Sequence, residues 1–329
     1  MNTRWQFVIL VLTSVLIPSA LLAQESYPTK PIRIIVPFPT GRGPDITTRQ
    51  IAAGMSPLLG QPVVIENRPG AAGIVGTEVA AKAAPDGYTL YAGPITTIAM
   101  APYLYSSLPY DVERDFVPIS QLNGTLIGIV IPPGLPVKSV KELIELSKKQ
   151  PLNVGTSGVG SSLHLYAMWF AMLTGANFHY IHYNTSNPGP DLMAGRIDAA
   201  FDAIPSYVGT YHGGKVKILV VAGKVVAGKE RHPSFPEVPT FAESGLAEFE
   251  PSSSSGLFAP TGVPQPIIDR LAVAVARASK SPDLIERFRA QGSEPGGSTP
   301  AEYAAFIKSE QAKWKRVIRA ADVRLDQVK

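Results

Sequence analysis

A unit made of a β-strand, a loop rich in glycine or proline, and an amphipathic helix recurs along the chain and restricts its fold more than any other feature. The β-branched run 32–38 leads into a loop at 39–45, and apolar residues then recur at the helical period over 46–59. The same order returns as a strand at 63–66, a helix at 73–84 and a strand at 88–91. Strands that alternate with helices predict an α/β protein with a mostly parallel sheet.

A second set of the same units begins near Asn123. We expect its strands at 126–131, 152–156, 178–183, 197–202 and 217–221, and its helices at 139–149, which Ser139 caps, and at 163–173, with Gly175 behind it. The C-terminal third contains two amphipathic helices, at 266–279 and 300–320, and little sheet. This order predicts two lobes: residues 24–122 together with 240–329 form the first, and the inserted residues 123–239 form the second.

The N-terminal residues have the pattern of a cleavable signal peptide. One cation, Arg4, precedes an apolar stretch from Trp5 to Ile17 that is too short to span a bilayer, and small residues follow as far as Ala23. Residues 1–23 are therefore predicted to direct export and to be removed. The sequence contains 0 cysteines, so we expect neither disulfides nor a lipid anchor, and an exported chain that is soluble.

Charge and motif patterns argue against several classes of function. The formal net charge of +4 falls to +3 when Arg4 is removed with the signal peptide, and no basic run accompanies it, so nucleic acid is not an expected partner. The glycine pairs at 41–43 and 158–160 lack the third glycine of a dinucleotide fingerprint. His179 and His182 would point to opposite faces of a strand, which disfavours a metal site. We expect no cofactor, no metal and no enzymatic activity.

The first loop that could hold a ligand covers residues 37–45. Gly41 and Gly43 would let backbone N–H groups approach an anion, and Asp45 could cap the helix that follows. Arg42 would add a planar cation that suits a carboxylate. Alternatively, Arg42 is a solvated residue at the tip of a loop.

The second such loop, residues 155–164, joins a predicted strand to a predicted helix. Its small residues would offer N–H and O–H donors without bulk, and they are Thr156, Ser157, Gly160, Ser161 and Ser162. Capping of the helix by Ser161 or Ser162 is a simpler role that the same residues can fill. We predict that His164 is packed against its neighbours or lies at the rim.

Two further groups of polar residues remain open between a binding and a structural role. Asn184 and Ser186 follow a predicted strand, ahead of prolines that suit the start of a helix. Asp198 and Asp202 lie four residues apart on a predicted strand, and therefore on one face of it. No nucleophile accompanies this acidic pair, which disfavours a hydrolase or isomerase that would use Asp202 with His164.

These features resemble the Bug family of tripartite tricarboxylate transporter substrate-binding proteins along essentially the whole mature chain. The motifs that carry the resemblance occur in order: Tyr27-Pro28-x-Lys30-Pro31-Ile32-Arg33, the Pro37-Phe38-Pro39 loop that ends in Asp45, Glu66-Asn67-Arg68-Pro69-Gly70-Ala71, Pro85-Asp86-Gly87-Tyr88-Thr89-Leu90, Leu108-Pro109-Tyr110-Asp111 and Pro236-Glu237-Val238-Pro239-Thr240.

The resemblance implies a periplasmic binding protein of the type II-like, Venus-flytrap kind, in which two α/β lobes close on a carboxylate. Its expected partners are a small carboxylate and membrane transporter subunits, and it is expected to act as a monomer. A sensor that passes its closed form to a signalling partner is the alternative. The implied ligand-binding residues are Phe38, Thr40, Gly41, Arg42, Asp45, Thr96, Thr156, Ser157, Gly160, Ser161, Ser162, Asn184 and Asp202.

Two departures from the family pattern bear on specificity. The first loop reads Thr40-Gly41-Arg42-Gly43 where two glycines are common, and Ser252 to Ser255 precede Gly256 where an aromatic residue is common. A more cationic and roomier site would follow if Arg42 faces the cleft. The resulting hypothesis is a dianionic or aromatic carboxylate as the ligand.

Overall fold

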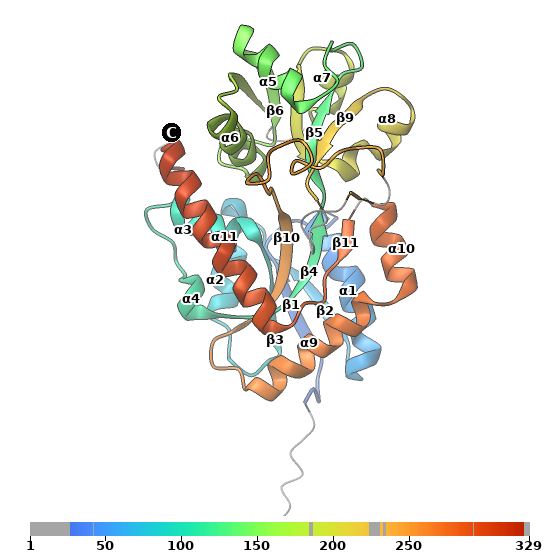
Figure 1. Cartoon of the computed structure of the whole chain (residues 1–329). Coiled ribbons are helices and arrows are strands. Elements are labelled where there is room, and N and C mark those ends of the chain that lie inside the picture. Colours follow the sequence, from blue (N-terminus) through green and yellow to red (C-terminus); the bar gives the residue numbers. More distant parts are fainter. Residues whose placement is uncertain are drawn as a thin grey trace, which may run out of the picture.

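The computed structural model describes residues 27–41, 43–183, 187–223, 231–232, 235–291 and 293–325. The described elements form two β-sheets, one in each half of the elongated molecule (Figure 1). We call the part built on the six-stranded sheet lobe one and the part built on the five-stranded sheet lobe two. The predicted signal peptide, residues 1–23, lies outside the described residues. Within the described ranges, no helix is long and apolar enough to cross a membrane.

Lobe one has the strand order β11-β4-β10-β3-β1-β2. Its strands are β1 (Ile32–Val36), β2 (Val63–Asn67), β3 (Thr89–Pro94), β4 (Phe116–Thr125), β10 (Ser253–Pro260) and β11 (Ser293–Pro295). Its helices are α1 (Gly43–Leu59), η1 (Ala71–Gly73), α2 (Ile74–Ala81), η2 (Thr96–Met100), α3 (Ala101–Leu104), α4 (Val112–Asp115), α9 (Gln265–Ser279), α10 (Pro282–Ala290) and α11 (Pro300–Ala321).

Lobe two has the strand order β7-β6-β8-β5-β9. Its strands are β5 (Ile127–Ile131), β6 (Leu152–Thr156), β7 (Phe178–His182), β8 (Ala199–Ala203) and β9 (Lys217–Val221). Its helices are α5 (Val140–Lys149), α6 (Ser162–Thr174), α7 (Gly189–Met193), η3 (Ile204–Tyr207) and α8 (Val208–His212).

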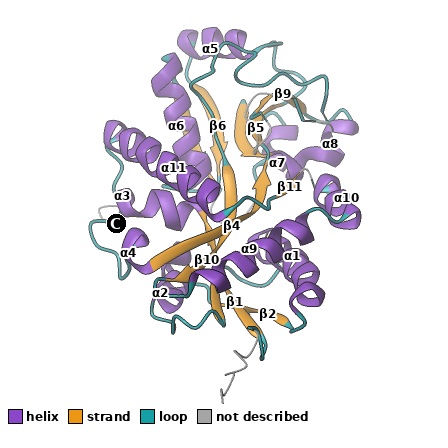
Figure 2. Ribbon diagram, turned by 60° about the horizontal axis from the view of Figure 1, so that its bottom comes forward, coloured by secondary structure: helices purple, strands orange, loops and turns teal. Residues whose placement is uncertain are grey.

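The sheets are mixed, so the expectation of mostly parallel sheets is wrong. Strand β1 lies parallel between β2 and β3, and β6 lies parallel between β7 and β8, as the repeated units predict. However, β10 pairs antiparallel with β3 and β4, and β5 pairs antiparallel with β8 and β9. The antiparallel strands are those where the chain passes between the lobes without a helical connection. Strand β4 of lobe one is followed almost directly by β5 of lobe two, and β10 lies in lobe one where the chain has returned (Figure 2).

Both faces of the lobe-one sheet are covered, which explains the continuous apolar run of β1. Ile34 packs into a cluster with Met55 of α1 and Leu271 of α9, whereas the next residue, Ile35, belongs to a cluster on the opposite face with Tyr91. Consecutive side chains of a strand point to opposite faces, so a strand covered on both sides needs apolar residues at every position.

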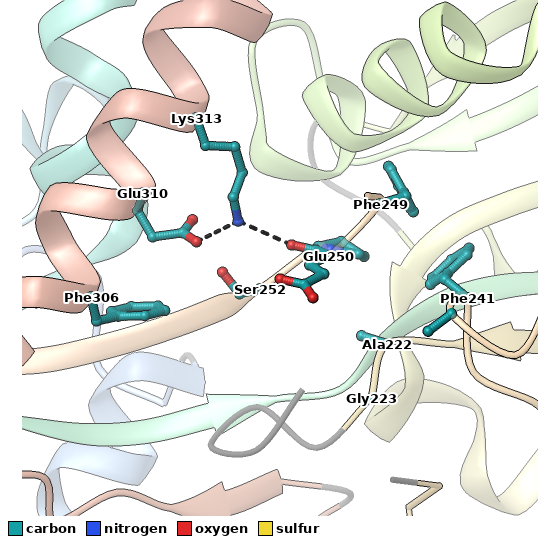
Figure 3. A pocket seen from close by; sticks show the side chains of 11 residues that line it. Ala222, Gly223, Phe241, Phe249, Glu250, Ser252, Phe306, Glu310 and Lys313 are labelled. Atoms are coloured by element: carbon teal, nitrogen blue, oxygen red, sulfur yellow. Dashed lines mark hydrogen bonds and ion pairs between the residues drawn. The ribbon is translucent and has the colours of Figure 1, made fainter. Parts of the chain in front are cut away.

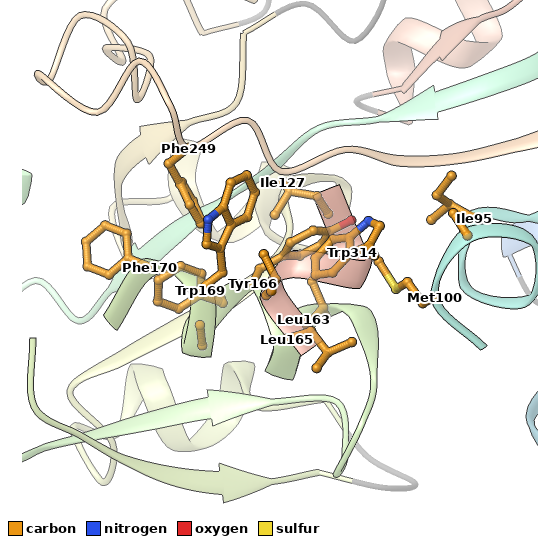
Figure 4. Packing of buried hydrophobic residues seen from close by; sticks show 14 of the residues in the cluster. Ile95, Met100, Ile127, Leu163, Leu165, Tyr166, Trp169, Phe170, Phe249 and Trp314 are labelled. Atoms are coloured by element: carbon orange, nitrogen blue, oxygen red, sulfur yellow. The ribbon is translucent and has the colours of Figure 1, made fainter. Parts of the chain in front are cut away.

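An aromatic contact joins the lobes outside the crossing strands. Trp314 of α11, in lobe one, lies with its ring centre 5.3 Å from that of Tyr166 and 6.0 Å from that of Trp169, both on α6 of lobe two. Phe249 packs against Trp169 at 4.7 Å (Figure 4). Fully burying one such ring contributes on the order of 2–3 kcal/mol, so this contact holds α6 against α11.

Two observations bear on the points where we expect the chain to change lobes. Strand β4 continues as far as Thr125 in the lobe-one sheet, past the expected start of lobe two at 123. Thr240, the expected return point, forms a parallel bridge with Val221 at the end of β9 in lobe two. The division of the chain into residues 24–122 plus 240–329 and 123–239 stays a prediction.

Candidate functional site

A hollow of about 520 Å³ lies between the lobes, at the carboxyl ends of β1, β3 and β6. We call it the main pocket. Such strand ends are where open α/β sheets usually bind ligands. Lobe one lines it with Phe38, Ala72, Ile74, Thr96, Thr97, Ala101, Leu104, Tyr105 and Leu325, and lobe two with Ser157, Gly158, Val159, Gly160, Ser161 and Ser162. None of these side chains is a carboxylate, an ammonium or a guanidinium.

The start of α6 forms the lobe-two wall of the main pocket. The Oγ of Ser161 accepts a hydrogen bond of 3.2 Å from the His164 N–H, so Ser161 is the N-cap and its hydroxyl proton stays available. The N–H of Gly160, at φ 71°, donates to Nδ1 of His164 over 3.1 Å. The positive end of the α6 dipole therefore faces the pocket, and these two hydrogen bonds hold the loop before it.

Three other hydroxyls line the main pocket without a partner in the described parts of the chain, those of Thr96, Ser157 and Ser162. Thr97 is different, because its Oγ1 donates to the Pro94 carbonyl at 3.1 Å and bonds the buried Tyr91 hydroxyl at 2.8 Å. The partner-free hydroxyls can donate to a ligand oxygen from both lobes.

Asp45 does not cap α1, so that expectation is wrong. The helix already begins at Gly43, and the Asp45 carboxylate turns back to accept bonds from the Gly41 N–H at 2.8 Å, Arg49 Nε at 2.9 Å and Asn67 Nδ2 at 2.9 Å. Burial opposes ionisation of Asp45, but these hydrogen bonds outweigh it and hold its pKa below the usual value. Asp45 therefore organises the loop from within.

Most of the first predicted loop lies away from the main pocket. Of the described residues of this loop, Phe38 alone lines the main pocket, while the Thr40 hydroxyl donates to Oδ1 of Asn67 at 3.0 Å. Gly41 and Asp45 bond each other. Arg42 lies outside the described residues, so its proposed contact with a ligand stays a prediction.

Thr156 supports the second loop from below, because it is fully buried and is not among the pocket-lining residues. Its Oγ1 lies 2.9 Å from Nδ1 of His182. The His182 ring meets the His164 ring edge-on at 4.7 Å, and Tyr180 packs on His164 at 5.0 Å. Burial, and then the nearby His182, lower the pKa of His164 to about 4. His164 is thus packed, as the sequence suggested.

Asp202 lies near the end of β8 with only 9% of its surface exposed, and it does not line the main pocket. Its carboxylate accepts bonds from the Ala203 N–H at 2.7 Å and the Tyr207 hydroxyl at 2.8 Å, and burial raises its pKa. Asp198 precedes β8 and accepts the Asn153 N–H at 2.7 Å. Both acids therefore have structural partners. Asn184 and Ser186 lie outside the described residues.

A second interlobe hollow, of about 280 Å³, is also uncharged. The start of α1, the ends of β3 and β8, the strands β4, β10 and β11, the residue after α10, and η3 all contribute to its lining. The lining residues are Gly43, Pro44, Ile46, Thr47, Pro94, Asn123, Thr125, Ala203, Pro205, Ser206, Ser253, Ser254, Ser255, Gln291 and Ser293. Ser253, Ser254 and Ser255 belong to the run in which we expect a roomier site, and the Ser254 hydroxyl is buried with no partner among the described residues.

A much smaller hollow, of about 90 Å³, lies beside α11 (Figure 3). There Lys313 pairs with Glu310, and its Nζ also donates to the Glu250 carbonyl at 3.1 Å. Trp314 Nε1 donates to the same Glu310 carboxylate at 3.0 Å. This cluster ties α11 to the segment that leads into β10, and its hollow is too small for a dicarboxylate.

Several residues of the main pocket escaped sequence reasoning, namely Ala72, Ile74, Ala101, Leu104, Tyr105 and Leu325. Ala72 takes a left-handed conformation (φ 54°), which cannot be predicted from the presence of an alanine in the sequence. Leu325 follows the last helix and is far along the sequence from the loops that end the strands. Across the described ranges, no group of three or more His, Cys, Asp or Glu residues could hold a metal ion.

Comparison with known proteins identifies this architecture. The family model TctC, described as "Tripartite tricarboxylate transporter family receptor", matches residues 47–323. Protein BugT of Bordetella pertussis is 35% identical over 311 residues, which cover 93% of this chain and 94% of BugT.

Solved structures agree with that match. An R. palustris protein solved with adipate is 32% identical, with a TM-score of 0.76, and the match covers 91% of this chain and 99% of that one. MatC from Rhodopseudomonas palustris, solved with bound malate, is 32% identical, with a TM-score of 0.72. The match covers 89% of this chain and 100% of MatC. The predicted two-lobed periplasmic-binding fold is confirmed, and this chain belongs to the TctC family of tripartite tricarboxylate transporter receptors.

Proposed function

We propose that this protein captures a small carboxylate in the periplasm and delivers it to a membrane transporter of the tripartite tricarboxylate type. The carboxylate would lie in the main pocket and be held by the N-terminus of α6 and the hydroxyls of Thr96, Ser157 and Ser162. The family assignment supports the transport role, and the predicted signal peptide supports the location.

The observation that carries the proposal is the pairing of free hydroxyl and amide donors with an apolar wall. Donors at the start of α6 face hydroxyl and apolar groups of lobe one across about 520 Å³. Phe38, Ile74, Leu104 and Val159 give the pocket an apolar side. This combination suits an anion with a hydrocarbon body, such as an aliphatic di- or tricarboxylate or an aromatic carboxylate.

None of the described residues that line the main pocket has a charged side chain, and this bears on how the negative charge of the ligand would be balanced. Neutral donors and a helix dipole can stabilise a carboxylate without a cation, in the way that oriented amides bind anions elsewhere. The relatives solved with adipate and with malate support an aliphatic acid as the ligand.

The test compares each acid with its own neutral amide. Purified mature protein is heated with malate, adipate, tricarballylate or benzoate, and in parallel with the corresponding amides. At about a hundred times its dissociation constant, a ligand stabilises the fold by roughly 2.7 kcal/mol, which raises Tm by several degrees. Stabilisation by an acid and not by its amide is expected. Equal stabilisation by the amide would contradict recognition of the carboxylate.

Site variants locate the binding. Replacement of Ser162 by Ala removes a free donor and should weaken binding of the acid about tenfold, because a hydrogen bond to a charged group is worth about 1.5–3 kcal/mol. Ser309→Ala is the matched control, since that hydroxyl is exposed on α11 and bonds only the Phe306 carbonyl. Uptake of the labelled acid by cells with and without this protein tests delivery to the transporter.

A further inference from the structure

Residues 322–325, which we call the C-terminal tail, turn back to the cleft after α11. The helix ends at Ala321, and Asp322 takes a left-handed conformation (φ 51°) that turns the chain. The N–H of Leu325 then donates to the Leu104 carbonyl at 3.0 Å, and Arg324 Nη1 donates to the Tyr103 carbonyl at 2.9 Å. Two hydrogen bonds therefore hold Arg324 and Leu325 on α3.

Leu325 reaches from this anchor to lobe two. A Cβ atom built on Gly160 would lie 2.2 Å from Cδ2 of Leu325, so the side chain occupies the space directly over that glycine. Leu325 also lines the main pocket beside Ala101 and Leu104. It is a lobe-one side chain that closes the pocket against the loop before α6.

We infer that Leu325 is a specificity-determining residue that sets how long a carboxylate the main pocket accepts. The inference rests on the proposed function. An apolar side chain at a pocket wall selects by volume, and one methylene group in such a pocket changes binding by about tenfold or more. A shorter residue at 325 opens space for a longer hydrocarbon body, and a larger one removes it.

Calorimetric dissociation constants for malate, glutarate, adipate and suberate test this in the wild type, in L325A and in L325F. The ratio of the malate constant to the suberate constant should rise about tenfold in L325A and fall in L325F. L58A is the matched control, because Leu58 is 43% exposed on α1 and lies outside the pocket lining, so its ratio should stay at the wild-type value.

The outcomes separate the inference from the proposed function. Wild-type binding with a ratio unchanged within about twofold in both Leu325 variants would overturn the role of Leu325 alone. A ratio in L58A that shifts as much as in L325A would do the same, because the effect would then come from general loosening. No binding of any of these acids by the wild type would overturn the proposed function and, with it, this inference.

Discussion

The loops that precede α1 and α6 contain the same internal hydrogen bond but serve the pocket differently. In each, a glycine with positive φ donates its N–H to a side chain four residues later: Gly41 to Asp45 over 2.8 Å, and Gly160 to His164 over 3.1 Å. Gly160 lines the main pocket, whereas Gly41 and Asp45 do not.

The acceptor chemistry separates the two loops. Asp45 is ionised and also binds Arg49 and Asn67, so the first loop is closed onto lobe one. His164 accepts through a neutral ring nitrogen, and its ring packs edge-on against the rings of Tyr180 and His182. The second loop leaves its outer hydroxyls free for a ligand. A strand–loop–helix motif therefore indicates a possible binding site, and the direction of its donors decides whether one exists.

Acid should weaken the second loop more than the first, and this is the largest effect that we expect. An unfolded histidine binds its proton near pH 6.5, but His164 in the folded protein does so only near pH 4. The free energy of unfolding should therefore fall by about 3 kcal/mol as the pH drops from 6.5 to 4, since each pKa unit is worth about 1.4 kcal/mol.

Urea denaturation of the wild type and of H164N at several pH values measures this contribution. The asparagine keeps an acceptor near the Gly160 N–H but does not titrate, so the difference between the two proteins isolates His164 from the carboxylates that both retain. Identical losses of stability in acid would show that His164 contributes nothing to the pH dependence.

Removal of the Asp45 carboxylate tests how much its hydrogen bonds to the first loop stabilise the fold. D45A leaves the Gly41 N–H and the Asn67 amide without their acceptor, and the free energy of unfolding should fall by about 2 kcal/mol. D283A is the control, because Asp283 and Arg287 form an exposed pair at the same i,i+4 spacing that is worth well under about 1 kcal/mol. Equal losses in urea denaturation would mean that Asp45 is only a surface ion pair.

Alanine at the two donor glycines should strain the backbone by similar amounts but affect ligand binding differently. Gly41 and Gly160 have φ values of 81° and 71°, so each substitution should cost about 1 kcal/mol in backbone strain. A Cβ at Gly41 meets nothing within 4 Å, whereas one at Gly160 displaces Leu325. Calorimetry should show carboxylate binding weakened about tenfold in G160A only. Comparable weakening in G41A would erase the distinction between the loops.

The smallest effect concerns the helix caps. Ser161 at α6 and Ser139 at α5 each accept an N–H bond of 3.2 Å three residues on, so each change to alanine should cost about 1 kcal/mol or less of stability. Only S161A also removes a donor from the pocket, and only it should weaken carboxylate binding in a titration. Unchanged binding in S161A would assign Ser161 to capping alone.

Local features of the fold could be predicted from the sequence because short-range interactions produce them. Strand β6 occupies the expected residues 152–156, Ser139 caps α5, and the left-handed Gly175 ends α6. The helix start at the prolines after residue 187 is also present, as α7. Each of these depends on a capping side chain, a glycine or a run of apolar residues within one segment.

Strands β4 and β10 were not predicted, because their stability comes from pairing with each other across more than a hundred residues. Strand β4 contains Pro118 and Gly124, and β10 begins with serines, so neither has the β-branched alternation of an ordinary strand. Sheet pairing supplies the hydrogen bonds that local propensity does not predict.

The sequence by itself therefore determined the repeated strand–loop–helix units, the family motifs and the loop of residues 155–164. Only the tertiary structure decided which donors face the cleft: it turned Asp45 back onto its own loop, buried Thr156 and Asp202 with structural partners, and brought Leu325 over Gly160. The physical reason is that a side chain's direction and its partners depend on contacts between distant segments, which residue type and spacing do not encode.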